Sequence, residues 1–297
     1  NIEYANLIAE LCPSYGIKII NPSNIREDQY RPGMELWPSI EKQDYLIARN
    51  IHGLAYSEKK NANKKFFLKP KEYQLEVAQN IIKKYSLSIN KWFVGMHLRY
   101  ANDGEELRNP SPEIFQQTID FINQNEGTVI LVGSKKNKIY SNLNSVIDTT
   151  RLPISRFERE CLGIYIWSKS KFFVGCLSGG SYPPTTFGVR TLWLDLNPTI
   201  CTRPPCENDI VLPKRIFFKP ENRYLSFEEA NSRDHYICQT EFPEVAKKYG
   251  YEVKSVTFDL VKEILKELIY EKNNINPIFK EENHPIPFGA KIYTKNL

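Results

Sequence analysis

The second two-thirds of the chain consists of short apolar runs separated by segments with helical periodicity, and this succession is what most constrains the fold. Each run has the length of a strand and is mainly apolar rather than alternating, which is typical of strands covered on both faces of a parallel sheet. Strands are expected at residues 92–98, 128–132, 146–149, 171–176 and 191–194, and helices at residues 113–125, 155–168 and 256–270. Because strand–helix–strand crossovers are right-handed, we predict an α/β protein with a Rossmann-like doubly wound parallel sheet.

Residues 1–90 differ in pattern and are expected to form a smaller or incomplete N-terminal α/β region, while residues 91–297 form the main domain with a C-terminal helix and tail. Expected elements of the first region are a helix at 4–11, a strand at 17–20 and a helix at 71–85 with Leu75, Val77, Ile81 and Ile82 on its apolar side. Residue 1 is Asn, and the sequence holds only two methionines. We therefore expect the chain to be a piece of a longer polypeptide.

The composition excludes several classes of protein. With 41% hydrophobic and 25% charged residues, the chain is expected to be globular rather than disordered. A net charge of +5 from dispersed basic residues suits an anionic substrate but is too weak to indicate nucleic-acid binding. No apolar run reaches the ~18–20 residues of a membrane span. We expect a cytoplasmic protein with at most peripheral contact at the inner face of the cytoplasmic membrane.

The usual signatures of cofactor and metal sites are missing. The sequence contains no G-x-G-x-x-G and no G-x-x-x-x-G-K-[ST], which argues against an NAD, FAD or Walker-type ATP site. The six cysteines include a lone C-x4-C pair, Cys201 and Cys206, without a second pair or a neighbouring histidine. Reduced, buried thiols are expected rather than a zinc site. We expect no cofactor and no bound metal.

Residues that follow an expected strand are the candidates for chemistry, because open α/β sheets bind ligands outside the carboxyl ends of their strands. His97 and Arg99 lie two apart in the run Gly95-Met96-His97-Leu98-Arg99 and share one face of a strand. A strand-end arginine can bind a phosphate through two N–H groups and keeps its charge at any working pH. The alternatives are a structural ion pair for Arg99 and a hydrogen-bonded core position for His97.

A polar loop follows the same strand. Asp103, Glu105 and Glu106 offer carboxylates that could act as a general base or orient one, and Arg108 adds a positive charge. The alternative interpretation is an acidic, solvent-exposed loop.

Two turns of small residues follow later strands. Gly133 and Ser134 come after the second expected strand, where small residues would let the backbone approach a ligand closely. Residues 178–181, Ser-Gly-Gly-Ser, come after the fourth, and backbone N–H groups at such a turn can cradle a diphosphate without a Walker lysine. Ordinary turns are the alternative in both places.

The order of these motifs resembles that of the nucleotide-sugar-binding half of bacterial GT-B glycosyltransferases, a family distantly similar to O-fucosyltransferases and α-1,6-fucosyltransferases. It runs from G-x-H-x-R on a strand, through Arg-Asn and a helix, an apolar strand ending in Gly and an Asp-bearing strand, to a strand followed by G-x-x-S-G. The best match covers residues 94–197, with weaker similarity at 225–227 and 249–268. Because the individual motifs are short, the resemblance rests on their order.

The resemblance implies roles for the matched residues. Arg99, with His97 beside it, would contact the donor diphosphate and support the leaving group, and Asp148 would lie near the nucleoside. The other donor-binding positions would be Gly95, Arg108, Gly133, Ser134, Ser178, Gly179, Gly180 and Ser181. The sequence has Tyr100-Ala101-Asn102-Asp103 where fucosyltransferases carry Asp-Trp, so neither fucose nor guanine is implied.

The expected function is transfer of a sugar from a nucleotide-diphospho-sugar to a bacterial surface glycan or lipid-linked acceptor. Enzymes of this kind hold no metal, and the sequence has no Asp-x-Asp motif, so arginine and backbone N–H groups would stabilise the leaving diphosphate. The expected catalytic residues are Arg99, His97, Asp103 and Glu105. The alternative is a non-catalytic glycan- or nucleotide-binding module of the same fold. A phosphate-ester hydrolase is disfavoured because the sequence has no G-x-S-x-G elbow.

Overall fold

The computed structural model describes residues 7, 68–89, 91–100, 106–133, 143–197, 209–230, 243–270 and 291–292. By compactness the chain divides into two units, residues 1–81 with 154–165, and residues 82–153 with 166–297. The described part contains no helix that is long and apolar enough to cross a membrane. Apart from Leu7, which is helical and buried, the expected elements at 4–11 and 17–20 lie outside the described residues, as does the Cys201–Cys206 pair.

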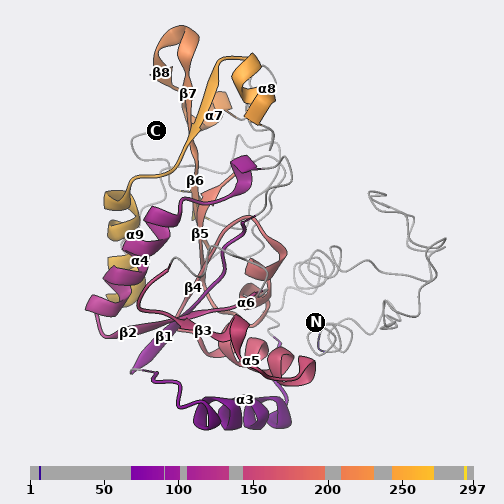
Figure 1. Ribbon diagram of the computed structural model, residues 1–297. Coiled ribbons are helices and arrows are strands. Elements are labelled where there is room, and N and C mark those ends of the chain that lie inside the picture. The colour runs from indigo at the N-terminus through magenta and orange to yellow at the C-terminus, as the bar shows by residue number, and fades with distance from the viewer. Residues whose placement is uncertain are drawn as a thin grey trace, which may run out of the picture. The chain divides into compact units, whose positions relative to one another are not determined.

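The described residues of the second unit form a seven-stranded sheet in which neighbouring strands are all parallel (Figure 1). Its strands are β1 (Trp92–Met96), β2 (Gly127–Leu131), β3 (Ile147–Asp148), β4 (Phe173–Gly175), β5 (Thr191–Leu196), β6 (Ile210–Pro213) and β10 (Lys291–Ile292). Their order is β10-β6-β5-β4-β1-β2-β3, so the sheet grows from β1 towards β3 on one side and from β4 towards β6 on the other. The reversal between β1 and β4 is the topological switch point of a doubly wound sheet. The α/β fold class predicted from the sequence is confirmed.

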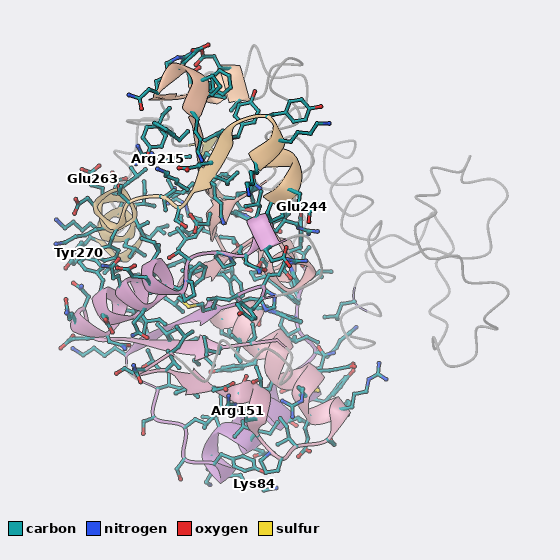
Figure 2. All side chains as sticks on the ribbon, turned by 45° about the horizontal axis from the view of Figure 1, so that its top comes forward. Lys84, Arg151, Arg215, Glu244, Glu263 and Tyr270 are labelled. Atoms are coloured by element: carbon teal, nitrogen blue, oxygen red, sulfur yellow. The ribbon has the colours of Figure 1, made fainter. Side chains whose placement is uncertain are left out.

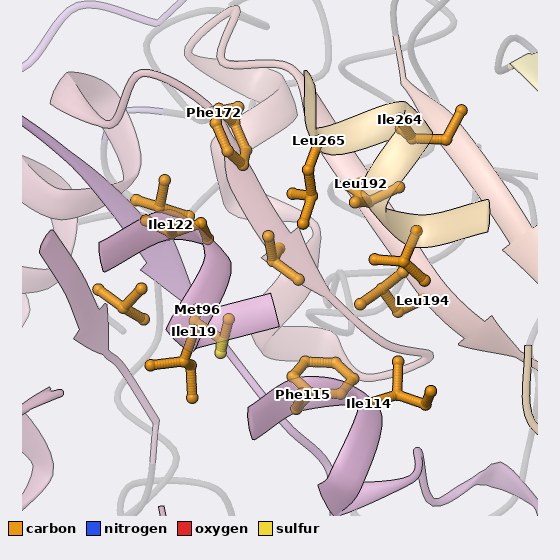
Figure 3. Packing of buried hydrophobic residues seen from close by; sticks show 14 of the residues in the cluster. Met96, Ile114, Phe115, Ile119, Ile122, Phe172, Leu192, Leu194, Ile264 and Leu265 are labelled. Carbon is orange, nitrogen blue, oxygen red and sulfur yellow. The ribbon is translucent and has the colours of Figure 1, made fainter. Parts of the chain in front are cut away.

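Both faces of the sheet are buried, as the unbroken apolar runs predict. Trp193 and Leu194 are adjacent in β5 and therefore point to opposite faces, yet both are 0% exposed. Helices α4 (Pro112–Gln124) and α9 (Phe258–Tyr270) cover the Leu194 face. Figure 3 shows this packing, with Ile114, Phe115, Ile119 and Ile122 of α4 and Ile264 and Leu265 of α9 near Met96, Phe172, Leu192 and Leu194.

Helix α4 begins at a capping serine and ends directly before β2. The Ser111 hydroxyl caps it by accepting a hydrogen bond from the Ile114 N–H at 3.4 Å. Gly127 is the first residue of β2, and Glu126 before it takes the left-handed backbone conformation with φ 62°. A Cβ at Gly127 would lie 2.5 Å from the Trp92 ring, so this glycine is needed for close packing against β1.

Helix α3 (Glu72–Lys84) forms where it was expected, and Ile81 is buried as predicted. The other residues expected on its apolar side, Leu75, Val77 and Ile82, are half-buried, and Gln74 and Ala78 are buried in addition. The Gln74 amide tolerates burial because its Oε1 accepts a hydrogen bond from the Lys71 N–H at 2.9 Å. Hydrophobic periodicity misses such a residue because it counts apolar side chains only.

A three-stranded antiparallel sheet, which the sequence analysis did not predict, also belongs to the second unit (Figure 1). It consists of β8 (Arg223–Tyr224), β7 (Arg215–Phe218) and β9 (Tyr251–Lys254), in that order. One side contributes Ile216, Leu225 and Tyr251 to a cluster with Ala230 of α7 (Phe227–Ala230) and Ala246 of α8 (Pro243–Lys248), and Leu107 packs against this cluster. The Arg215 guanidinium, labelled in Figure 2, lies 3.8 Å from the centre of the Tyr224 ring. Strands of two to four residues are too short to show a recognisable period.

The remaining described elements are helices α5 (Arg156–Lys169) and α6 (Pro183–Thr186) and the 3-10 helices η5 (Glu106–Arg108), η7 (Thr149–Arg151), η8 (Gly179–Ser181) and η9 (Lys219–Glu221). Of these, η5 follows β1 and η8 follows β4. Both segments therefore begin at the carboxyl edge of the parallel sheet, on either side of its switch point.

Candidate functional site

The segments that follow β1, β2 and β4 are held together at the carboxyl edge of the sheet. The His97 N–H donates a hydrogen bond to the Val174 carbonyl at 3.0 Å, and the Val132 N–H donates to the Met96 carbonyl at 2.9 Å. These backbone bonds continue the parallel pairing beyond the last residue of β1. The structure thus brings the expected residues His97, Arg99 and Gly133 to one edge.

The His97 ring connects this edge to the Ser-Gly-Gly-Ser turn. Its Nδ1 lies 3.0 Å from the Val132 carbonyl oxygen and its Nε2 lies 2.9 Å from the Ser178 Oγ, a residue 81 positions further along the chain. Burial lowers the pKa of His97, although the bond to the Val132 carbonyl acts in the opposite direction. In the neutral ring, Nδ1–H donates to the carbonyl, so Nε2 accepts the Ser178 hydroxyl proton. Both ring nitrogens are therefore engaged.

The turn after β4 packs tightly on its inner side and is open on its outer side. A Cβ at Gly180 would lie 2.8 Å from the His97 Nε2, and a Cβ at Gly175 would lie 2.5 Å from the Ser181 Oγ. Ser181 is 0% exposed, and its hydroxyl accepts a hydrogen bond from the Cys176 N–H at 3.2 Å. A Cβ at Gly179 would meet no atom of the described residues within 4 Å.

The amide N–H groups of Gly179 and Gly180 have no hydrogen-bond acceptor among the residues that the structure describes. The Ser178 hydroxyl does not cap this turn, because it bonds to His97. Consecutive N–H groups at such a turn are suited to bind an anion.

Arg99 follows His97 and is half-buried beside the turn. Its backbone N–H donates to the Cys176 Sγ at 2.9 Å, and its guanidinium Nη1 donates to the Asn109 Oδ1 at 2.9 Å. An amide oxygen orients the guanidinium without neutralising its charge. Burial raises the pKa of the Cys176 thiol to about 12, so this cysteine is a neutral packing group at the sheet edge and not a nucleophile. Cys161 is likewise free and buried.

The loop that contains η5 brings Arg108 to the same region. Burial raises the pKa of Tyr182, which follows the Ser-Gly-Gly-Ser turn, to about 12, and the positive charge of Arg108 opposes this rise. The two side chains are therefore close enough to interact. Glu106 is half-exposed at the start of η5, whereas Asp103 and Glu105 lie outside the described residues.

Four buried or half-buried contacts hold this loop, and the sequence analysis did not single out Asp195, Asn197 or Lys214, which make three of them. Asn197 Nδ2 donates to the Leu107 carbonyl at 3.3 Å, and Lys214 Nζ donates to the Asn109 carbonyl at 2.6 Å. The Ser111 N–H donates to Asp195 Oδ2 at 2.8 Å. The fourth contact is the hydrogen bond from Arg99 to the Asn109 side chain. Asp195 and Asn197 end the β5 segment, so the rule that polar residues follow strands could have found them. Lys214 follows β6, a strand that the sequence analysis missed.

Two expected donor-binding residues have local structural reasons for their identity. Gly95 lies inside β1, where a Cβ would be 2.7 Å from the Phe173 ring, so its small size serves core packing. Asp148 ends β3, where its Oδ1 accepts from the Thr150 N–H at 2.9 Å and its Oδ2 lies 3.1 Å from the Arg151 Nε. Both carboxylate oxygens of Asp148 are thus used in starting η7.

The loop after β2 is described only at its start. Gly133 has φ 136°, a backbone conformation that favours glycine, and it directly follows the carbonyl that receives the His97 ring. Ser134 lies outside the described residues. Within the described part of the chain, no three His, Cys, Asp or Glu side chains gather in a group that could hold a metal ion.

The lowered pKa of His97 predicts a dependence of stability on pH. Since the unfolded histidine has a pKa of about 6.5, the unfolded state binds more protons below that pH, and the free energy of unfolding falls as the pH drops from about 6.5 through the lower pKa of the folded state. One proton contributes at most about 1.4 kcal/mol per pH unit. Urea denaturation between pH 5 and 7.5 should show this slope reduced in His97→Asn, which keeps a donor for the Val132 carbonyl. Equal slopes in both proteins would mean that folding does not lower the pKa of His97.

No family model matches the sequence, and no curated protein matches it. One solved structure that matches is a family 9 glycosyl transferase from Veillonella parvula, with a TM-score of 0.48 and 12% identity over 69% of this chain and 54% of that one. Another is the E. coli ADP-heptose LPS heptosyltransferase II, with a TM-score of 0.45 and 15% identity over 69% of this chain and 54% of that one. A third is the E. coli heptosyltransferase WaaC with ADP, with a TM-score of 0.37 and 13% identity over 76% of this chain and 57% of that one. The chain spans about half the length of these structures. All three carry the name of a glycosyltransferase, and none carries that of a fucosyltransferase.

Proposed function

We propose that this chain is the donor-binding part of a GT-B glycosyltransferase, which transfers a sugar from a nucleotide-diphospho-sugar to a bacterial glycan or lipid-linked acceptor without a metal ion. The observation that carries the proposal is the hydrogen bond between His97 and Ser178. It joins the G-x-H-x-R strand end to the Ser-Gly-Gly-Ser turn at the switch point of the sheet, where doubly wound folds bind their ligands.

The groups at this edge suit the departure of a diphosphate. Arg99 and Arg108 supply permanent positive charge, and the amides of Gly179 and Gly180 supply N–H donors. Donors placed before the reaction stabilise charge that develops on the leaving group, without the cost of reorienting solvent. Because the Ser178 hydroxyl donates its hydrogen bond to His97, the turn would bind the anion through its backbone N–H groups.

His97 receives a role different from the catalytic one expected from its motif. A general base needs a free nitrogen within reach of the acceptor hydroxyl, but both nitrogens of His97 bind protein groups. We assign it to positioning the turn. Asp103 and Glu105 stay the proposed candidates for the base, and Gly133 and Ser134 are proposed to lie beside the donor.

A non-catalytic binding module would have been favoured by separation of the Arg99 and Ser178 segments. They instead meet through His97, and Arg99 donates its backbone N–H to the cysteine that ends the β4 segment. Positive charge and N–H donors gathered at one edge can stabilise a leaving diphosphate, and this arrangement favours the enzyme.

The experiment that tests the proposal is a thermal-shift screen with UDP, GDP, CMP, ADP and dTDP, followed by the diphospho-sugars of the base that binds. A ligand that binds only the folded state raises the melting temperature. We expect one nucleoside diphosphate to stabilise the wild type and Lys91→Ala but not Arg99→Ala. Lys91→Ala is a matched control, because this substitution also removes one positive charge, but at the opposite end of β1, where the Lys91 side chain is 78% exposed. Stabilisation by none of the five, or equal stabilisation of Arg99→Ala, would refute the donor site.

Transfer should not depend on divalent cations. The proposed site stabilises the diphosphate with arginines and backbone N–H groups, so chelation removes nothing that the reaction uses. We expect the rate of sugar transfer to be unchanged by excess EDTA. A loss of transfer that Mn²⁺ or Mg²⁺ restores would show that a cation completes the site.

A further inference from the structure

We propose that Lys214 is a positioning residue for Arg99, acting through Asn109 to set the direction in which the guanidinium presents its N–H groups. The inference rests on the proposed function of this edge as an anion-binding site. Lys214 lies between β6 and β7, in neither of the motifs that define the site.

Asn109 is the residue that connects the two cations. Its side-chain Oδ1 accepts a hydrogen bond from the Arg99 Nη1 at 2.9 Å, and its backbone carbonyl accepts one from the Lys214 Nζ at 2.6 Å. The second contact spans 105 positions in the sequence. Movement of the Asn109 backbone would carry its side-chain oxygen, and with it the preferred direction of the guanidinium.

The backbone on either side of Asn109 is held by hydrogen bonds from buried side chains of the β5 segment. Leu107 is bound through its carbonyl by Asn197, and Ser111 is bound through its N–H by Asp195. Asp195 and Asn197 are 0% and 2% exposed. Lys214 supplies the contact between these two anchors, at Asn109, which accepts a hydrogen bond from Arg99.

The charge on Lys214 is unfavourable for packing alone. Burial lowers the pKa of Lys214, and the nearby Asp195 carboxylate and Cys176 act in the opposite direction. A methionine of similar length would fill the space without the cost of burying a charge. The ammonium group is therefore explained by its hydrogen bond to the Asn109 carbonyl and by its attraction to the nearby Asp195 carboxylate.

The first test measures Arg99 directly and needs no ligand. In protein labelled with ¹⁵N-arginine, the Arg99 Nε–H signal is identified by its loss in Arg99→Ala. We expect this signal to shift in Lys214→Met and to return towards its wild-type position in Lys214→Arg. Lys219→Met is the matched control, because Lys219 instead pairs with Glu252 at 2.7 Å, and it should leave the signal unchanged.

The second test is a double-mutant cycle in the dissociation constant for inorganic pyrophosphate. A residue that acts through another loses its effect when that other is removed. We expect Lys214→Met to weaken binding about tenfold in the wild-type background, the order expected for one hydrogen bond to a charged group. In the Arg99→Ala background, the same substitution should change binding by less than about twofold.

The proposal is overturned by an unchanged Arg99 signal in folded Lys214→Met, or by equal losses of binding in the two backgrounds. If wild-type protein binds no pyrophosphate, the proposed function fails, while the Arg99 signal still decides whether Lys214 positions that side chain. If Lys214→Met shows no cooperative melting, Lys214→Ala takes its place in both tests, because it also removes the hydrogen bond to Asn109 and leaves room for water beside the Asp195 carboxylate.

Discussion

Replacement of Arg99 by alanine is expected to lower the turnover of sugar transfer by about 10²–10³-fold, the usual effect of losing one preorganised donor to a developing negative charge. The protein should still fold, because the backbone N–H that binds Cys176 is kept and the guanidinium is only half-buried. Arg99→Lys should also lower turnover strongly. Lysine keeps the charge but lacks the planar fork that binds Asn109 and a phosphate oxygen at the same time.

Turnover, donor affinity and melting temperature measured on the same preparations separate a catalytic from a structural arginine. Lys91→Ala controls for the loss of one positive charge and should match the wild type, since its ion pair with Glu126 is exposed. A variant of Arg99 that melts at a lower temperature, while its turnover per folded molecule stays normal, would assign Arg99 to structure alone.

Gly180→Ala is expected to disrupt the site from within. The added Cβ would lie 2.8 Å from the His97 Nε2 and 2.9 Å from the neighbouring ring carbons, and the Val132 carbonyl holds the ring on its other side. Either the ring or the turn must move, which breaks the 2.9 Å contact between His97 and Ser178. Overpacking of a buried position costs about 1–3 kcal/mol of stability. We expect a lower melting temperature and a loss of nucleotide binding together.

Gly179→Ala is the matched comparison one residue earlier. In the part of the chain that the structure describes, its Cβ would meet no atom within 4 Å, so the melting temperature of the free protein should equal that of the wild type. If the anion approaches this turn closely, the same methyl group should weaken nucleotide binding without any change in stability. Calorimetric titration and a melting curve on the two variants give the comparison. Wild-type nucleotide binding by Gly180→Ala would mean that the turn is no part of the donor site.

Local sequence patterns were sufficient for much of the fold. The runs at 92–98 and 171–176 are mainly apolar, and the sheet buries both faces of the strands within them, because apolar residues suit a strand covered on two sides. Helix α9 follows from its periodic apolar stripe, and α4 follows from that stripe and its Ser111 cap. The candidate residues after β1 and β4 were found in the same way, since a polar residue directly after a buried strand stands out.

The same patterns could not show which of these residues meet. Ser178 lies 81 positions after His97, and the two touch only because β4 pairs with β1 at the point where the strand order reverses. Strand order depends on the packing of the whole domain and leaves no local trace. It also places Gly95 against Phe173, a packing role that the motif did not show, while its donor-binding role stays a prediction.

The sequence by itself determined that this is a parallel α/β protein and which strand ends carry polar residues, because hydrophobic periodicity and turn chemistry are properties of neighbouring residues. Only the tertiary structure decided that Asp195, Asn197 and Lys214 hold the loop whose Asn109 binds Arg99. A buried polar group takes its partner from whatever lies next to it in space. For these three residues that partner is about 85 to 105 positions away in the chain.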